Sequence, residues 1–367
     1  MNNACIVLQK RINPTDLRIR AFFDLLQAEG FPFEEIRFTL QSDADGIKEG
    51  LKNFKQKTQN LFLIADKTAL PIVKTHLSGV FNDIPQSEFG NAGIYLDGNC
   101  SLFLISADET ETGLGFAINA CIPHLRRKYG VQFENVTLRA IGANDGRVED
   151  LIAKTRAMSG DQKLFCVRNR KYDEDVIKIV YEKNVSKKLT DDVLRTFVDG
   201  LGDTLYALND VSLEQQIVDL LKLRRRKLCV AESFTGGGIA RRITSVSGAS
   251  EVYFEGLNTY DELSKVKRLG VSEYTLRTSG AVSDQTAYEM ASGLLRTGDC
   301  DISIATTGLA GPNSDRSALP VGLSYIAIGT KERVFVYRYK FDGSREEITE
   351  KAINYALFLA YRQLKNM

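Results

Sequence analysis

The stretch KLCVAESFTGGG, residues 227–238, decides the fold expected for the C-terminal half of the chain. Its first half is mostly apolar and ends at Glu232, a composition typical of a buried strand. The glycines at 236–238 mark a loop, and a helix is predicted from there to about Val246. A strand that runs into a glycine loop and then a helix is the repeating unit of an open α/β sheet.

A second junction of this kind lies at residues 301–312. Asp301 to Thr307 is predicted to be a buried strand, and it enters the loop Gly308-Leu309-Ala310-Gly311-Pro312. In open α/β sheets, loop amides and helix N-termini beyond the carboxyl ends of strands can hold an anion. Glycines after strands are also ordinary turn residues, but two such loops on one domain favour a ligand site.

Histidine is absent from the half of the chain that contains both loops. The two histidines are His76 and His124, so a Ser-His-Asp hydrolase confined to residues 125–367 is excluded. If Ser233 is a nucleophile, Lys265 or Lys267 is its candidate base, because a desolvated lysine is partly neutral at pH 7. An ordinary exposed lysine is the alternative at either position.

The first 130 residues alternate strand-like and helix-like segments. Strands are predicted at 4–8, 35–40 and 61–65, and Asn13 is predicted to cap the first helix. This order predicts a doubly wound α/β domain at residues 1–134. Residues 135–209 have a different pattern of strand-like, turn-rich and helical segments, which predicts a small α+β insert. Residues 210–367 are predicted to form the third domain.

A run of five cations lies at residues 222–227, at the end of a helix predicted for residues 212–223. One interpretation is a site for an anionic partner. The favoured interpretation is a solvated helix end, where cations complement the negative end of the helix dipole.

Composition and charge exclude several classes of protein. The 367 residues carry 48 Lys and Arg against 47 Asp and Glu, so no general attraction to nucleic acid or an acidic membrane is expected. No apolar run approaches the roughly 20 residues of a membrane helix, and the first residues lack a signal pattern. The six scattered cysteines argue against a zinc site or a disulfide framework. We expect a soluble cytoplasmic protein without a metal or another cofactor.

Six motifs of the C-terminal half resemble the CinA C-terminal domain family. Residues 231–237, AESFTGG, are similar to the family signature A-E-S-C-T-G-G. The others follow in the family's order: Tyr260 with Lys265, Gly280-Ala281-Val282-Ser283, Thr307-Gly308-Leu309-Ala310-Gly311-Pro312, Pro320-Val321-Gly322, and Gly343-Ser344-Arg345. The resemblance covers residues 213–367 and implies hydrolysis of nicotinamide mononucleotide to nicotinic acid mononucleotide and ammonia, without a metal.

The resemblance also implies roles for single residues. Ser233 would attack the carboxamide carbon, Lys265 would take the serine proton, and Tyr260 would assist proton transfer or positioning. Substrate-binding positions carried over by motif are Thr235, Gly236, Gly237, Ser283, Thr307, Gly308, Gly311 and Arg345, the last as a phosphate contact.

The chain departs from the family pattern beside the expected site. The cysteine of the signature is Phe234 here, and residues 261–264 read DELS where the family usually has S-N-E-A. The glycine run after Pro312 is replaced by Asn313-Ser314-Asp315-Arg316, and Leu319 stands where the family often has a lysine. We therefore expect an intact Ser-Lys pair with an altered ligand loop.

The rest of the chain resembles the other parts of full-length CinA proteins. The N-terminal domain is similar to a molybdopterin-binding-like domain that in the family can hydrolyse ADP-ribose. Its glycine motifs are replaced by residues 9–13, 65–71 and 106–111, so a pyrophosphate could not approach the backbone closely. We predict an inert scaffold for a homodimer. The insert resembles a KH-like connector, but Gly142 and Gly146 do not form the G-x-x-G loop that binds RNA.

The leading hypothesis is a nicotinamide mononucleotide deamidase with a small nucleotide as its partner; nucleic acid and membrane are disfavoured. One alternative is a non-enzymatic interaction protein linked to competence or DNA damage, which Phe234 and the altered 313–319 loop would favour. The other is an ADP-ribose pyrophosphatase in the N-terminal domain, which the missing glycines disfavour.

Overall fold

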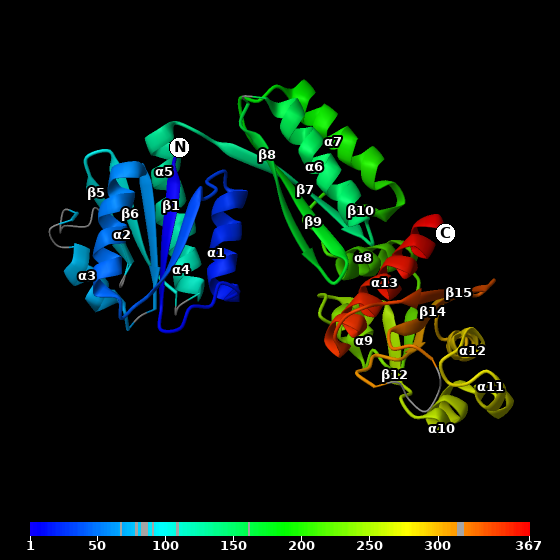
Figure 1. Cartoon of the computed structure of the whole chain (residues 1–367). Helices are drawn as coiled ribbons and strands as arrows, with labels where there is room; N and C mark the ends of the chain where they lie inside the picture. Colours follow the sequence, from blue (N-terminus) through cyan, green and yellow to red (C-terminus); the bar gives the residue numbers. More distant parts are fainter. Residues whose placement is uncertain are drawn as a thin grey trace. The chain divides into compact units, whose positions relative to one another are not determined.

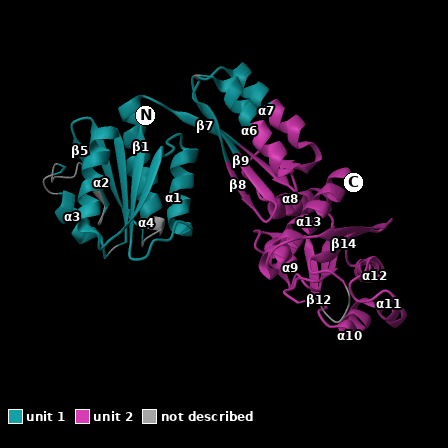
Figure 2. Cartoon of the chain, viewed as in Figure 1, with its two compact units in different colours: residues 1–136, 152–167, 178–194 teal, residues 137–151, 168–177, 195–367 magenta. Residues whose placement is uncertain are grey.

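The computed structural model describes residues 1–66, 68–77, 80–81, 87–89, 92–107, 110–160, 162–313 and 319–367. The chain is an α/β protein built on three sheets, which confirms the fold class predicted from the sequence (Figure 1). It divides into two compact units, one of residues 1–136, 152–167 and 178–194, the other of residues 137–151, 168–177 and 195–367 (Figure 2). The division runs through the middle sheet, so the three domain boundaries stay a prediction.

The first sheet has six strands in the order β2-β1-β3-β6-β5-β4. The four strands from β2 to β6 are parallel, and β5 and β4 continue the sheet in antiparallel fashion. The strands are β1 (Asn3–Gln9), β2 (Glu35–Leu40), β3 (Asn60–Ala65), β4 (Ser87–Phe89), β5 (Ala92–Asp97) and β6 (Cys100–Ser106). The helices are α1 (Leu17–Ala28), α2 (Ala44–Lys57), α3 (Leu70–Leu77), α4 (Thr110–Phe116), the π-helix η1 (Ala117–Cys121) and α5 (Ile122–Tyr129).

Helices cover both faces of this sheet. Cys5 and Val7 of β1 pack with α1, α4 and α5, whereas Ala4, Ile6 and Leu8 of the same strand pack with α2 and α3. Successive side chains of a strand point to opposite faces. Burial on both faces explains why these strands are continuous apolar runs in the sequence.

The start of α1 differs from the prediction. Asn13 is not the helix cap, because α1 begins at Leu17 and the Asp16 carboxylate accepts the Arg18 N–H. The Asn13 side chain instead accepts the Thr15 N–H and so closes a turn just before the helix. Asn and Asp stabilise turns and helix caps by the same kind of hydrogen bond, which is why the sequence pattern placed the start one turn too early.

The middle sheet has the order β10-β7-β9-β8. Its strands are β7 (Phe133–Ile141), β8 (Leu164–Lys171), β9 (Glu174–Glu182) and β10 (Leu205–Ala207). Its helices are α6 (Asp145–Ser159), α7 (Lys187–Leu201) and the 3-10 turn η2 (Gly202–Thr204). Strands and helices thus occur in this region as the α+β prediction requires.

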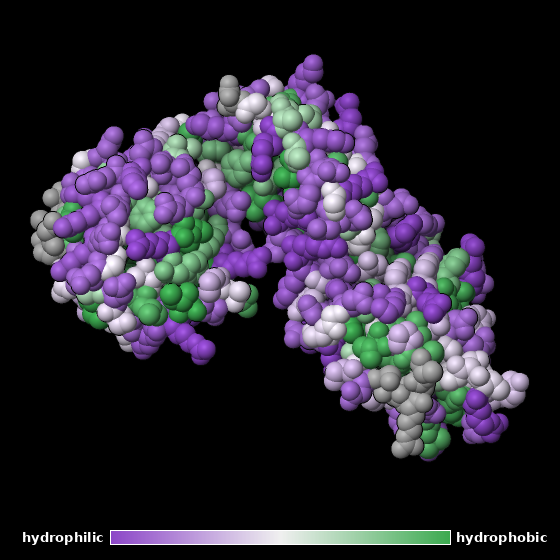
Figure 3. All heavy atoms as spheres, in the orientation of Figure 1, coloured by the Kyte–Doolittle hydropathy of each residue, from purple (hydrophilic) through white to green (hydrophobic). Residues whose placement is uncertain are grey.

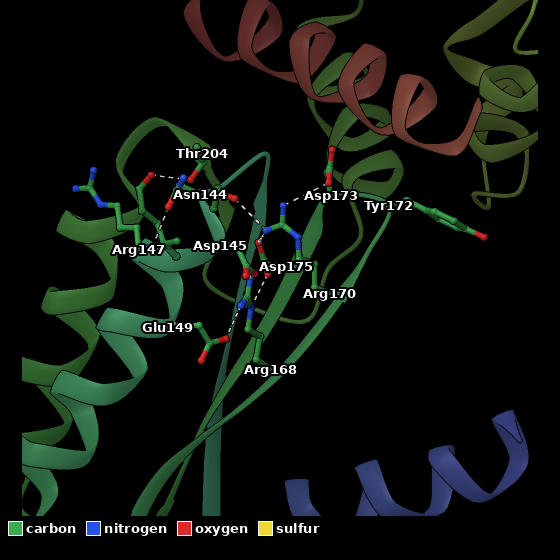
Figure 4. A network of polar contacts seen from close by, with 12 residues as sticks. Asn144, Asp145, Arg147, Glu149, Arg168, Arg170, Tyr172, Asp173, Asp175 and Thr204 are labelled. Carbon is green, nitrogen blue, oxygen red and sulfur yellow. Dashed lines mark hydrogen bonds and ion pairs between the residues drawn. The ribbon is translucent and has the colours of Figure 1, made fainter. Parts of the chain in front are cut away.

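A network of ion pairs joins the start of α6 to β8 and β9 (Figure 4). The fully buried Asp175 carboxylate accepts hydrogen bonds from Arg168 and Arg170, each at 2.7 Å. Arg168 also pairs with Asp145 and Glu149 in the first turns of α6. Both arginines are therefore committed to internal carboxylates, which hold the helix against the sheet.

The third sheet has the order β12-β11-β13-β14-β15. Strands β12, β11 and β13 are parallel, and β14 and β15 form an antiparallel hairpin beside them, as predicted. The strands are β11 (Leu228–Glu232), β12 (Tyr253–Asn258), β13 (Ile302–Gly308), β14 (Leu323–Thr330) and β15 (Val334–Lys340). The helices are α8 (Leu213–Arg224), α9 (Gly238–Thr244), η3 (Ala249–Glu251), α10 (Glu262–Ser264), the π-helix η4 (Lys265–Leu269), α11 (Glu273–Thr278), α12 (Asp284–Leu295) and α13 (Arg345–Asn366).

Helices also cover both faces of the third sheet. Leu228 and Val230 pack with α8, α9 and α13, whereas Cys229 and Ala231 pack with α12. The cations at 222–227 lie at the opposite end of β11 from its glycine loop. There Lys222 pairs with Glu251 at 3.0 Å. Arg226 pairs with Asp301 at 2.9 Å, so part of the run serves internal ion pairs.

Hydrophilic side chains cover most of the face seen in Figure 3, and hydrophobic ones gather around α1 and α4. None of the helices in the described ranges is both long and apolar enough to cross a membrane. All six cysteines are free thiols. In the part of the chain that the structure describes, histidine, cysteine and carboxylate side chains form no group of three that could hold a metal ion.

Candidate active site

The candidate site lies at the carboxyl ends of β12, β11 and β13, three adjacent parallel strands. Ser233 directly follows β11, Thr259 directly follows β12, and Gly308 is the last residue of β13. Because parallel strands end at the same edge of a sheet, three loops far apart in the sequence meet there. This is the edge at which the sequence predicted a ligand site.

Ser233 and Lys265 are in direct contact. The Lys265 side chain is 1% exposed, and its Nζ lies 3.1 Å from Ser233 Oγ. The same nitrogen donates to the carbonyls of Thr259 at 2.7 Å and Tyr260 at 3.2 Å. Burial lowers the pKa of Lys265, while Glu262 and Asp261 partly oppose that shift. Lys267, the other candidate base, is exposed.

Glu232 fixes the loop that carries Ser233. Its carboxylate is 1% exposed and accepts the N–H groups of Gly237 and Ile239, each at 3.1 Å, and of Ala240 at 2.9 Å. The carboxylate thus occupies the N-terminus of α9, where a negative charge is stabilised. The start of this helix is therefore already satisfied within the protein.

The two glycines predicted to bind substrate serve the loop itself. Gly236 and Gly237 have φ values of +61° and +92°, which side chains rarely adopt, so glycine is needed at both positions. The Gly236 N–H donates to the Ser233 carbonyl, and the Gly237 N–H is taken by Glu232. The N–H groups of Phe234 and Thr235 have no acceptor among the described residues, so they are the loop amides without a partner within the protein.

Hydroxyl groups of the predicted site make contacts beneath the loops. Thr235 Oγ1 lies 2.7 Å from Thr306 Oγ1, and both residues are buried. Thr307 Oγ1 donates to the Ala281 carbonyl at 2.6 Å. Ser283 caps α12 through the Thr286 N–H. These side chains hold neighbouring loops together, and Ser283 in particular has a structural partner rather than an open hydroxyl.

Arg345 links two of the loops. It is the first residue of α13, and its guanidinium donates to the Gly311 carbonyl at 2.6 Å and to the Tyr260 hydroxyl at 3.0 Å. Tyr260 is 60% exposed. The structure therefore brings the Tyr260 carbonyl to Lys265 and the Tyr260 hydroxyl to Arg345, but it does not bring that hydroxyl to Ser233.

The Phe234 side chain lies in a hydrophobic cluster. It is 5% exposed and packs with Ala310, Phe341, Ile348 and Ala352. Its ring also lies so close to Gly308 that a Cβ at that position would come within 2.9 Å of it. The ring thus fills the space between Gly308 and Ala310 of the second glycine loop and the start of α13.

Some of the residues at which the chain differs from the family motifs lie outside the described residues. In the altered ligand loop these are Ser314, Asp315 and Arg316, together with the next two residues; Asn313 and Leu319 are described. In the N-terminal domain, Lys67, Asp108 and Glu109 fall in the same category.

Three residues of this site, Glu232, Thr259 and Thr306, were not among the site residues predicted from the sequence. Glu232 has a recognisable signal, since an acidic residue shortly before a helix can complement the positive end of the helix dipole. Thr259 and Thr306 have no such signal. Their importance depends on contacts with residues that are distant in the sequence, Lys265 for Thr259 and Thr235 for Thr306.

Known families and proteins were compared with the sequence, and the family match includes the candidate site. The CinA C-terminal domain family matches residues 210–364. A protein of Caldicellulosiruptor saccharolyticus named as competence-damage inducible is 35% identical over 255 residues, which cover 67% of this chain and 60% of that protein. A CinA-like protein of Kosmotoga olearia is 31% identical over 249 residues, covering 67% and 60% of the two chains. This chain thus spans about three fifths of the length of the curated relatives that it matches.

Solved structures of competence/damage-inducible proteins are similar to part of this chain. The competence/damage inducible protein of Agrobacterium tumefaciens is 35% identical, with 42% of this chain and 93% of that chain covered and a TM-score of 0.40. The corresponding protein of Klebsiella pneumoniae is 31% identical, with 42% and 95% covered and a TM-score of 0.41. From the family match and its curated relatives, we conclude that the chain belongs to the CinA family.

Proposed function

We propose that this protein hydrolyses the carboxamide of nicotinamide mononucleotide, with Ser233 as the nucleophile and Lys265 as the base. The observation that carries the proposal is the buried Lys265 Nζ at 3.1 Å from Ser233 Oγ. A lysine held in a desolvated position is pushed toward its neutral form, and only the neutral amine can accept a proton.

The partners of Lys265 fit a neutral amine. A neutral amine has two N–H donors and one lone pair, and the nitrogen has two carbonyl acceptors and one hydroxyl as neighbours. The carbonyls of Thr259 and Tyr260 take the two N–H groups. The lone pair is then directed at the Ser233 hydroxyl, which can donate to it.

The reaction proceeds by acyl transfer. Ser233 Oγ attacks the carboxamide carbon while its proton passes to Lys265 Nζ. The proton is then delivered to the amide nitrogen as the C–N bond breaks and ammonia leaves. Water, activated by the same amine, hydrolyses the ester and regenerates the serine. The free N–H groups of Phe234 and Thr235 are the candidate donors to the oxyanion, since the amide after the nucleophile commonly serves this purpose.

Arg345 is the candidate contact for the phosphate of the nucleotide. A guanidinium suits a phosphate monoester because its planar donors match two phosphate oxygens. Its bonds to the Gly311 carbonyl and the Tyr260 hydroxyl hold it at the mouth of the site. We assign Tyr260 to the positioning of Arg345 rather than to proton transfer.

The burial of Phe234 supports an enzymatic function over a purely structural one. A large residue beside the nucleophile would block a substrate only if its side chain faced the loop amides. Here the ring belongs to a hydrophobic cluster. One of the two features that favoured the non-enzymatic alternative, a large residue beside the nucleophile, is thus accommodated by packing.

The experiment is ammonia release from nicotinamide mononucleotide with EDTA present, for the wild type and Ser233→Ala. We expect turnover by the wild type and a loss of about 10³-fold or more in kcat for the variant. Equal turnover by both proteins would remove Ser233 from the mechanism. Absence of turnover by a folded wild type would refute the proposed substrate.

A further inference from the structure

A cavity lies in the first unit, at the end of the first sheet where its parallel strands begin. It has a volume of about 600 Å³ and lies between the β5–β6 turn and α5. This is the end of the sheet where β1 begins, close to the N label in Figure 1. None of the cavity's residues takes part in the proposed deamidase site.

The cavity collects positive charge, and the described residues that line it include no acidic one. Arg127 and Lys128 line it, and His124 lies one helical turn before Lys128 on the same helix. Arg127 has no ion-pair or hydrogen-bond partner in the described part of the chain. Asp97, on the nearby β5, is engaged by Lys55 at 2.5 Å and does not line the cavity.

Lys128 is held by neutral groups alone among the described residues. Its Nζ lies 2.8 to 3.1 Å from four acceptors, which share its three N–H groups: the carbonyls of Gln59 and Asn99, Asn60 Oδ1 and Ser101 Oγ. These bonds explain why the ammonium is fixed, but they leave its charge uncompensated. Burial accordingly lowers the pKa of Lys128.

Ser101 and His124 extend this group of donors. Ser101 Oγ accepts from Lys128, so its own proton can be donated to His124 Nε2, which lies 3.2 Å away. His124 is then neutral, with its proton on Nδ1. Burial lowers the pKa of His124, and the charges of Lys128 and Arg127 lower it further. Cys100, beside Ser101, has a pKa raised by burial and adds no negative charge.

The four neutral neighbours of Lys128 account for the position of that side chain. Beside it on the same wall lie Arg127, which is exposed and has no partner in the described part of the chain, and the half-buried His124. The remaining wall is apolar and includes Ile94, Leu96 and Ala120. A dianion with an attached apolar group would compensate the cations and cover this wall.

We propose that this cavity binds a phosphate monoester, with the phosphate held by Arg127, His124 and the field of Lys128. The organic part of the ester lies against the apolar wall. The site is distinct from the candidate active site, because all of its residues belong to the first unit.

The histidine content of the chain gives a local test. His76 and His124 are the two histidines, so their imidazole resonances can be assigned in the full-length protein with a His124→Gln variant. Phenyl phosphate, inorganic phosphate and acetate are titrated at constant pH and ionic strength. We expect a saturable shift of the His124 resonance alone, with the order of affinity phenyl phosphate, phosphate, acetate, and a rise of the His124 titration midpoint when the site is filled.

Two variants separate this site from other anion sites. Arg127→Gln removes one charge-assisted hydrogen bond and is expected to weaken phenyl phosphate binding about tenfold. Lys10→Gln, which removes an exposed charge from the loop after β1, is the matched control and should leave the affinity unchanged. A His124 resonance that does not respond to phenyl phosphate overturns the proposal, as does an Arg127→Gln variant with the wild-type affinity. Acetate binding as tight as phosphate binding overturns the assignment of a dianion.

Discussion

The first and third sheets share a plan, but they differ at the carboxyl ends of their central strands. Both have parallel strands at their centre and helices on both faces. After β11, Ser233 meets a buried lysine. After β1, the Gln9 side chain accepts the Asn13 N–H and closes the loop on itself, while Lys10 and Arg11 are exposed. The sheet edge therefore supplies a position for a site, and the burial of a reactive group supplies the chemistry.

The two sheets also differ in the free-energy cost of placing their cations. Desolvating a lysine costs free energy, which the third sheet offsets only in part by two carbonyls and a hydroxyl. Lys10 and Arg11, in the loop after β1, are exposed to water and incur no such cost. A buried, incompletely compensated lysine is therefore the feature that marks the third sheet as the candidate site.

The largest expected effect tests that feature directly. Lys265→Ala should lower kcat for nicotinamide mononucleotide by about 10³-fold, because the serine loses its base. The matched control is Lys267→Ala, which removes an exposed lysine two residues away and should keep wild-type kcat. Ammonia release measures both. If both variants behave alike, the contact between Lys265 and Ser233 is not the source of activity.

The pH dependence sharpens the same point. The base acts when neutral, so kcat/KM should rise about tenfold per pH unit and level off at the pKa of Lys265. Burial lowers that pKa, so the plateau should begin below the ordinary lysine range. In the unfolded chain Lys265 has an ordinary lysine pKa and therefore keeps its proton to higher pH than in the folded protein. The free energy of unfolding should therefore rise with pH between the folded and unfolded pKa values of Lys265. A pH–rate profile of the wild type checks the first expectation, and a flat profile would contradict it.

A smaller effect is expected at the loop before Ser233. Glu232→Gln keeps the shape of the side chain but removes the charge that satisfies three amides at the start of α9. We expect a loss of about 1–2 kcal/mol in the free energy of unfolding. The same change should lower kcat about tenfold through misplacement of Ser233. Urea unfolding and steady-state kinetics measure the two effects. An unchanged stability would show that the cap is not needed.

The smallest effect is expected in the first sheet. Gln9→Ala and Asp66→Ala alter the loops after β1 and β3 and should leave ammonia release within twofold of the wild type. With Mg²⁺ added, we also expect no hydrolysis of ADP-ribose by the wild type, because glycines are missing where a pyrophosphate would approach the backbone. ADP-ribose turnover that Gln9→Ala or Asp66→Ala abolishes would give the first sheet an activity of its own.

Much of the fold follows from local patterns. The apolar runs at β1, β3 and β11, the glycine loop after β11 and the capping box at Ser344 were all predicted in the right places. The cap of α1 was assigned to Asn13 instead of Asp16, because both residue types suit turns and caps equally well. The reason for the overall agreement is that strand burial and helix capping depend on neighbours in the sequence.

The sequence by itself excluded a Ser-His-Asp hydrolase confined to residues 125–367, and it left Lys265 or Lys267 as the candidate base if Ser233 is a nucleophile. Only the tertiary structure decided that Lys265 is the buried one, that Phe234 packs in a hydrophobic cluster, and that the Tyr260 hydroxyl meets Arg345. Each of these outcomes depends on contacts between residues 32 to more than 80 positions apart. Such contacts are set by the packing of whole strands and helices, which no local pattern encodes.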